Sequence, residues 1–80
     1  MNKHLLNTIV EIVQFFANCG DDECDPDASV RMLEVIAYHA QKLTKKQKSE
    51  FAAHCENLAS EAEDAELGDF LREIPANLGL

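Results

Sequence analysis

The chain has 80 residues, 46% of them hydrophobic, and its 15 acidic side chains against 7 basic ones give a formal net charge of -8. This length allows one domain with a small core, and the hydrophobic content excludes a disordered chain. The negative charge argues against nucleic-acid binding, because a phosphate backbone attracts Lys and Arg side chains. It favours a basic protein partner, although the charge is also explained if it only keeps a small protein soluble.

Neither a membrane span nor a targeting segment is expected. No run approaches the ~20 apolar residues that cross a bilayer. The apolar segment 1–13 is interrupted by Asn7 and Glu11 and lacks a small-residue cleavage site, which favours a helix of the mature chain over a signal peptide. The three cysteines are an odd number, so the sequence predicts reduced thiols in a cytoplasmic protein rather than a disulfide framework.

The first expected helix covers residues 2–18. Its apolar residues follow the i, i+3, i+4, i+7 spacing and cover more than half of its circumference. Such a girth is typical of a central bundle helix, or of a helix that faces the core on one side and a partner on the other. Gly20 is expected to end this helix in a left-handed conformation.

An acidic stretch separates this helix from a second one, expected over residues 26–43. Asp25 is suited to cap the second helix, with Pro26 at its first position and Asp27 in its first turn. The remaining acidic residues of the stretch are not needed for helix initiation. Any function of the stretch should therefore rest chiefly on Asp21, Asp22 and Glu23.

Two more helices are expected over residues 45–63 and 65–74. Thr44 fits the start of a capping box, and Asp64 is placed to cap the fourth helix. The apolar line of the third helix is rich in small residues, which favours close approach of a neighbour. Pro75 is expected to end the fourth helix. The prediction is an all-α fold: a single domain, residues 1–80, folded as a compact bundle of about four helices.

A calcium site in the acidic stretch is the first chemical alternative. Asp21, Glu23 and Asp25 match the first three ligand positions of an EF-hand loop. However, Pro26 stands where such a loop needs glycine, and Met32 stands where it needs a bidentate Glu. Helix capping and solvation explain these residues without a metal ion.

Zinc binding and catalysis are also disfavoured by the residue spacing. Cys19 and Cys24 are five residues apart rather than in a C-x2-C pair, and Cys55 falls on an apolar line where a small core residue is expected. No catalytic signature or glycine-rich phosphate loop is present. We therefore expect no metal, no cofactor and no enzymatic activity.

Protein binding is the remaining function with positive support. Besides the first acidic stretch, a second acidic run lies at the expected break before the fourth helix. In a bundle of alternating antiparallel helices the first and third loops lie at the same end, so the two runs should form one negative surface. Phe15 and Tyr38 lie at the margins of their apolar stripes, where they are either anchors for a partner or ordinary core-edge residues. The expected partner-binding residues are Asp21, Asp22, Glu23, Asp25, Asp27, Tyr38, Glu61, Glu63, Asp64 and Glu66.

A resemblance adds to this interpretation. The residues that carry it are Asp21-Asp22, Asp25-Pro26-Asp27-Ala28, Val30-Arg31, Leu33-Glu34 and Ile36-Ala37, followed by Phe70-Leu71-Arg72, Pro75 and Leu78-Gly79-Leu80. Their order resembles a set of short, acidic, all-helical bacterial proteins of unassigned function. In size, charge and helical content the chain is also similar to the immunity proteins of contact-dependent growth-inhibition systems. That resemblance implies a cytosolic protein that binds and neutralises a toxin domain, often a nuclease.

Two function hypotheses follow. The first is an immunity protein whose acidic surface covers a basic toxin domain. The second is a homo-oligomeric helical adaptor or regulatory protein, because self-association would bury the excess apolar girth of the first helix.

Overall fold

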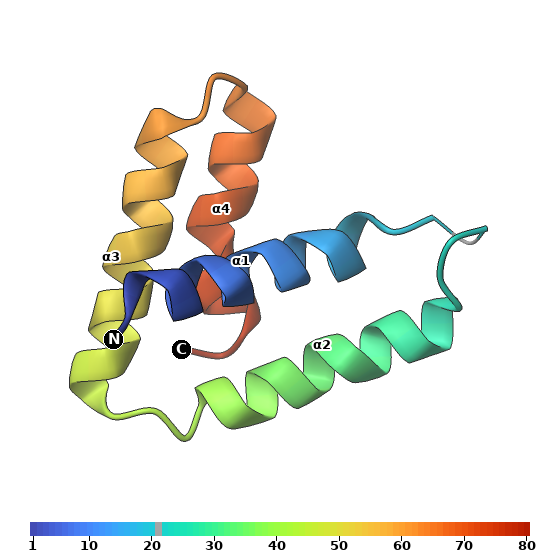
Figure 1. The fold of residues 1–80 in the computed structure, drawn as a ribbon, viewed down its shortest axis with the longest axis horizontal. Helices are drawn as coiled ribbons and strands as arrows, with labels where there is room; N and C mark the ends of the chain where they lie inside the picture. The colour runs from blue at the N-terminus through green and yellow to red at the C-terminus, as the bar shows by residue number, and fades with distance from the viewer. Residues whose placement is uncertain (21) are drawn as a thin grey trace.

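The computed structural model describes residues 1–20 and 22–80, and within them it contains four helices and no strand. The helices are α1 (Lys3–Asn18), α2 (Pro26–Ala40), α3 (Lys45–Glu61) and α4 (Ala65–Asn77). Figure 1 shows two helical hairpins, α1/α2 and α3/α4, with the second standing across the first. The predicted all-α bundle of four helices is confirmed.

The core is built mainly by α1, α3, α4 and the C-terminal tail. The most extensive helix pair is α3 with α4, and α1 contacts all three other helices. In α2 the one buried residue is the polar Ser29, and apolar residues such as Leu33 and Ile36 are half-buried against the core. The buried apolar residues are Leu6, Val10, Val13, Phe51, Cys55, Ala59, Leu71, Ile74 and Leu78.

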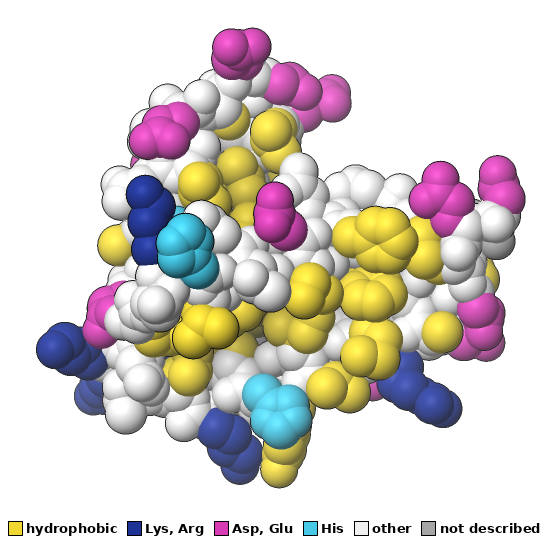
Figure 2. All heavy atoms as spheres, viewed as in Figure 1, with side chains coloured by type: hydrophobic (Ala, Val, Ile, Leu, Met, Phe, Trp, Pro, Cys, Tyr) yellow, Lys and Arg dark blue, Asp and Glu magenta, His cyan; other side chains and the backbone are white. Residues whose placement is uncertain are grey.

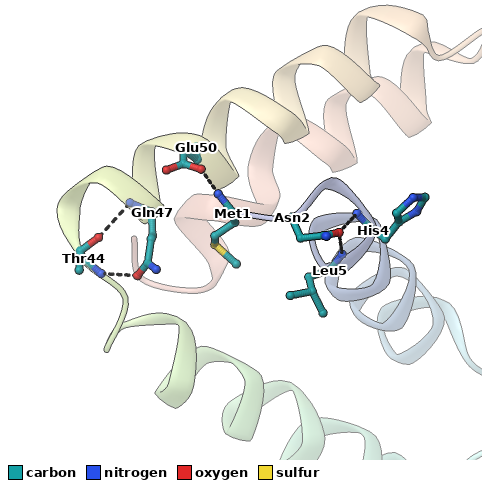
Figure 3. A network of polar contacts seen from close by, with 7 residues as sticks. All are labelled: Met1, Asn2, His4, Leu5, Thr44, Gln47 and Glu50. Atoms are coloured by element: carbon teal, nitrogen blue, oxygen red, sulfur yellow. Dashed lines mark hydrogen bonds and ion pairs between the residues drawn. The ribbon is translucent and has the colours of Figure 1, made fainter.

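The predicted helix starts are confirmed by their capping contacts. Oδ1 of Asp25 accepts from the backbone N–H of Asp27 at 3.3 Å. Thr44 and Gln47 form the reciprocal capping box drawn in Figure 3, at 3.0 and 3.1 Å. Asp64 caps α4 through the N–H of Glu66 at 3.0 Å. These side chains satisfy backbone donors that the first helical turn leaves without a partner.

Polar contacts also attach the start of α1 to α3. Asn2 caps α1, and the N-terminal ammonium group of Met1 is hydrogen-bonded to the carboxylate of Glu50 in α3 (Figure 3). This hydrogen bond, with the charge of the ammonium group, holds the pKa of Glu50 below its ordinary value. One turn further along α1, Asn7 pairs with Nε2 of His54 at 2.6 Å.

The prediction that Pro75 ends α4 is wrong, because the helix continues to Asn77. Its last turn closes through the N–H of Leu78, which donates to the carbonyl of Ile74 at 3.0 Å. Gly79, with φ of 79°, then turns the chain so that the N–H of Leu80 reaches the carbonyl of Pro75 at 2.9 Å. This left-handed glycine satisfies the terminal carbonyls, and burial of Ile74 and Leu78 favours the extra turn over the local preference of the residue before a proline.

The predicted end of the first helix at residue 18 is confirmed, but its cause differs, and the ends of α2 and α3 differ from the prediction. α1 ends because Cys19 is extended (φ -68°, ψ 129°), and Gly20 does not have a positive φ. α2 stops at Ala40, three residues before position 43, because the next N–H groups bond three residues back in a tighter turn. α3 stops at Glu61, two residues before position 63. None of the helices in the described residues is long and apolar enough to cross a membrane.

Candidate protein-binding surface

The acidic loop, defined here as residues 19–25, joins α1 to α2 at one tip of the molecule (Figure 1). The N–H groups of Glu23 and Cys24 both donate to the carbonyl of Gly20 at 3.0 Å, which folds the loop back on itself. Asp22, Glu23 and Asp25 are exposed, as is Asp27 in α2. None of these four carboxylates forms an ion pair with another described residue. The predicted site residue Asp21 lies outside the described residues.

The expectation of reduced thiols is wrong for two of the three cysteines. Cys19 and Cys24 form a disulfide, with their Cα atoms 6.0 Å apart. The extended conformation of Cys19 at the end of α1 and the turn at Gly20 bring the two residues together. An odd cysteine count excludes complete pairing but not one pair, and Cys55 is the residue left over. The disulfide closes a ring around the acidic loop and rules out Cys24 as a free thiol in this structure.

Cys55 is a core residue, as the sequence predicts. Its side chain is fully buried in α3, and burial raises the pKa of its thiol to about 11. A thiolate is the reactive form of cysteine, and at neutral pH almost none is present at such a pKa. Cys55 should therefore be inert while the chain is folded.

Thiol counting with a chromogenic disulfide reagent at neutral pH checks this arrangement. The folded, non-reduced chain should release no signal, and unfolding in guanidinium should reveal one thiol, that of Cys55. After reduction and removal of the reductant under exclusion of oxygen, the folded chain should give two fast thiols. Rapid reaction of the folded, non-reduced chain would contradict the assignment, and a Cys55→Ser variant separates the two sources of signal.

The second acidic run lies at the turn between α3 and α4. Its predicted site residues, Glu61, Glu63, Asp64 and Glu66, are all exposed. Figure 1 shows this turn at a different tip of the molecule from the acidic loop, and acidic side chains lie at both tips in Figure 2. The two runs therefore do not form the single surface expected of alternating helices, because the α3/α4 hairpin crosses the α1/α2 hairpin.

Beside the acidic loop, α1 and α2 expose a set of large apolar side chains. Figure 2 shows hydrophobic side chains gathered over these two helices. We define the α1–α2 face as six residues, three from each helix, that are 39–59% exposed: Leu5, Ile12, Phe15, Met32, Val35 and Tyr38. Of these residues, Ile12, Phe15 and Met32 line one shallow hollow, and an exposed apolar surface of this kind is a candidate interaction site.

The two predicted anchors both belong to this face. Phe15 is 53% exposed and Tyr38 is 59% exposed, so about half of each side chain is available to a partner. The Tyr38 ring lies 5.1 Å from the ammonium of Lys42 and contacts the ring of His39 edge-on. The other members of the face were missed. For the members in α1, the wide apolar arc of residues 2–18 indicates exposed apolar side chains.

A hollow of about 590 Å³ lies between α1 and the α3/α4 hairpin. Glu11 and Glu61 stand at its margins, and Leu58 and Leu71 contribute to its apolar lining. Among the described residues, no three His, Cys, Asp or Glu side chains are grouped so that they could hold a metal ion.

Comparison with known proteins gives no match to a family model, to a curated protein or to a solved structure. The charges and exposed side chains of the chain itself are therefore the basis for a function.

Proposed function

We propose that the chain is an immunity-type inhibitor that binds a basic toxin domain, of the nuclease kind, through its acidic loop. The observation that carries the proposal is the set of four exposed carboxylates at this tip, those of Asp22, Glu23, Asp25 and Asp27. None of them has an ion-pair partner among the described residues. A nuclease site is positively charged because it binds phosphate. A projecting group of carboxylates is complementary to such a site.

The disulfide ring favours this contact in a chain that keeps Cys19 and Cys24 oxidised. A loop closed between Cys19 and Cys24 samples fewer conformations than an open loop, so less entropy is lost when its carboxylates are fixed against a partner. The acidic turn between α3 and α4 has no such closure. Because it lies at a different tip, it contributes long-range attraction, which salt screens over about 8 Å at physiological ionic strength.

Whether the Cys19–Cys24 disulfide forms depends on the cellular compartment in which the protein acts. A cytoplasmic location follows from the resemblance to immunity proteins, whereas disulfides persist mainly in oxidising compartments. A cytosolic inhibitor would carry Cys19 and Cys24 as thiols and would bind with an open loop. Binding should therefore be measured with and without reductant, and the reduced chain should bind more weakly, by up to about tenfold, if ring closure preorganises the loop.

The electrostatic proposal is tested by two charge reversals of equal size. Asp22→Lys with Glu23→Lys alters the acidic loop, and Glu34→Lys with Glu73→Lys alters exposed carboxylates elsewhere. Each pair adds four charges and takes the net charge from -8 to -4. With the toxin domain encoded beside this chain as the partner, the loop pair should slow association by about 10–100-fold at low salt.

The Glu34/Glu73 pair is the matched control and should slow association by less than about threefold. Stopped-flow measurements at increasing salt should bring the rates of the original chain and the loop variant together. Equal rates for both variants at low salt would refute a specific role for the acidic loop and leave only net charge.

A further inference from the structure

The α1–α2 face is a large exposed apolar surface for a chain of this size. Its six side chains together expose on the order of 500 Å², which is near the upper end of the largest apolar patches of monomers, about 300–600 Å². A stable interface buries about 800 Å² on each partner, so this face with a polar rim is large enough to form one. The packing of α2 also favours an interface, because the apolar side chains of this helix are not buried within the chain and its one buried residue, Ser29, is polar.

The face has a projection at one end and a hollow at the other. Phe15 projects near the acidic loop, where it is 53% exposed. Toward the opposite end of α2, Ile9, Val35 and Leu43 line a hollow of about 260 Å³ whose base includes Phe51. This volume is below the range of about 300–1,000 Å³ that is usual for small-molecule sites, and the lining is almost entirely apolar. It suits one large apolar side chain.

The charges at the two ends of α2 are also opposite. Asp25 and Asp27 lie at its N-terminal end, and Lys42 and Lys45 follow its C-terminal end. Figure 2 shows basic side chains near the α2–α3 turn and acidic ones near the α1–α2 turn. With 15 residues α2 is roughly 22 Å long, far beyond the screening length of about 8 Å, so the two ends do not neutralise each other within one chain.

We infer that the α1–α2 face binds the same face of a second copy of the chain, with the two α2 helices antiparallel across a two-fold axis. In this arrangement Phe15 of each copy enters the hollow beside Val35 of the other. The acidic end of each α2 lies against the basic end of its counterpart. An isologous interface requires such a self-complementary surface. Across the two-fold axis, the contact of Phe15 with the hollow and the contact between the acidic and basic ends of α2 each occur twice.

A second copy fits this face better than a purely basic partner. A basic protein would be attracted to the Asp25 and Asp27 end but repelled at the Lys42 and Lys45 end. The dimer leaves Asp22 and Glu23 beyond the paired helices. Asp25 and Asp27 belong to both surfaces, but Asp22 and Glu23 stay free for the proposed toxin binding, and variants at these two residues and at Phe15 can separate the two interactions.

Sedimentation velocity on the full chain from about 2 to about 200 μM, a range that brackets weak dimers, tests self-association. The mass should rise with concentration from 8.9 kDa toward twice that value. Phe15→Ser should raise the dimer dissociation constant by at least about 30-fold, as expected for an anchor that fills a pocket. Val30→Ser is the matched control, because Val30 is 54% exposed on α2 but lies outside the face, and it should change the constant by less than about threefold.

A charge exchange tests the antiparallel arrangement. Asp27→Lys and Lys42→Glu should each weaken the dimer by about three- to fivefold, and the two together should restore it, since the reversed ends meet again. Helix content from circular dichroism confirms that each variant is folded. A chain that stays monomeric to the highest concentration, including one whose face binds only a different protein, overturns the inference. So does a dimer that Phe15→Ser leaves intact or a charge pair that shows no rescue.

Asp22→Lys with Glu23→Lys should leave the dimer intact, and Phe15→Ser should leave toxin binding intact. Loss of the dimer in the first variant would overturn the assigned interface, because these carboxylates lie outside it. Loss of toxin binding in the second would overturn the separation of the two interactions.

Discussion

Replacing Phe51 by Ala is expected to lower the free energy of unfolding by about 3–5 kcal/mol, the usual cost of removing a buried ring. Phe51 is 1% exposed in α3 and forms the base of the hollow that Ile9 and Ile36 also line. It is therefore the principal buried link from α3 to the α1/α2 hairpin. An 80-residue domain has about 4–12 kcal/mol of total stability, so this one change removes a large part of it.

Urea denaturation followed by circular dichroism measures the loss. Phe15→Ala is the matched control, since it removes the same ring from a position that is 53% exposed. At a concentration low enough to keep the chain monomeric, the control should cost less than about 1 kcal/mol. Equal losses for the two variants would contradict the assignment of Phe51 to the core.

Replacing Gly68 by Val is the second change with a large expected effect, a loss of about 2–3 kcal/mol. A Cβ atom at Gly68 would lie only 3.3 Å from the backbone oxygen of Ala59 in α3, and the branched methyl groups of Val would extend further. By helix propensity alone, Gly68 weakens the fourth helix by about 1 kcal/mol relative to Ala. In the structure it is buried where α4 packs directly on the backbone of α3, which explains its presence.

Thermal and urea unfolding of two further variants separate crowding from helix propensity. Gly68→Ala should change stability by less than about 1 kcal/mol, because the gain in helix propensity of about that size offsets the tight contact. Gly20→Val should also have little effect, since among the described residues a Cβ there would have Oδ1 of Asp22 as its neighbour, at 3.8 Å. A large loss at Gly20 with none at Gly68 would reverse this account.

The local parts of the fold could be predicted from the sequence. Asp25, Thr44 and Asp64 were assigned as helix caps because a cap needs only its own side chain and the next two or three residues. Helix periodicity was informative for the same reason. Pro75 was misjudged because the burial of Ile74, which depends on distant elements, outweighed a local preference.

The relation between the hairpins could not be predicted. It depends on contacts between residues far apart in sequence, such as the approach of Gly68 to Ala59. For the same reason, all of the predicted site residues that the structure describes are exposed, but the two acidic runs lie at different tips. The odd cysteine count does not predict the disulfide, because the pairing of Cys19 and Cys24 depends on the extended conformation of Cys19 and on the turn at Gly20.

The α1–α2 face shows a further limit of periodicity. A pattern of apolar residues gives the width of an apolar arc but not how much of it a neighbour covers. In α2 the arc is packed mainly on α1, so Met32 and Val35 are left partly in water.

The sparse burial of α2 also sets the order in which the molecule opens. Helices α1, α3 and α4 share the buried core, whereas α2 adds only half-buried side chains and the hydroxyl of Ser29, which has no hydrogen-bond partner among the described residues. Backbone amides of α2 should therefore exchange with solvent through a partial opening that leaves the other three helices folded. A partner that binds the α1–α2 face should suppress this partial opening. The protection of α2 amides from exchange would then report how much of the face is occupied.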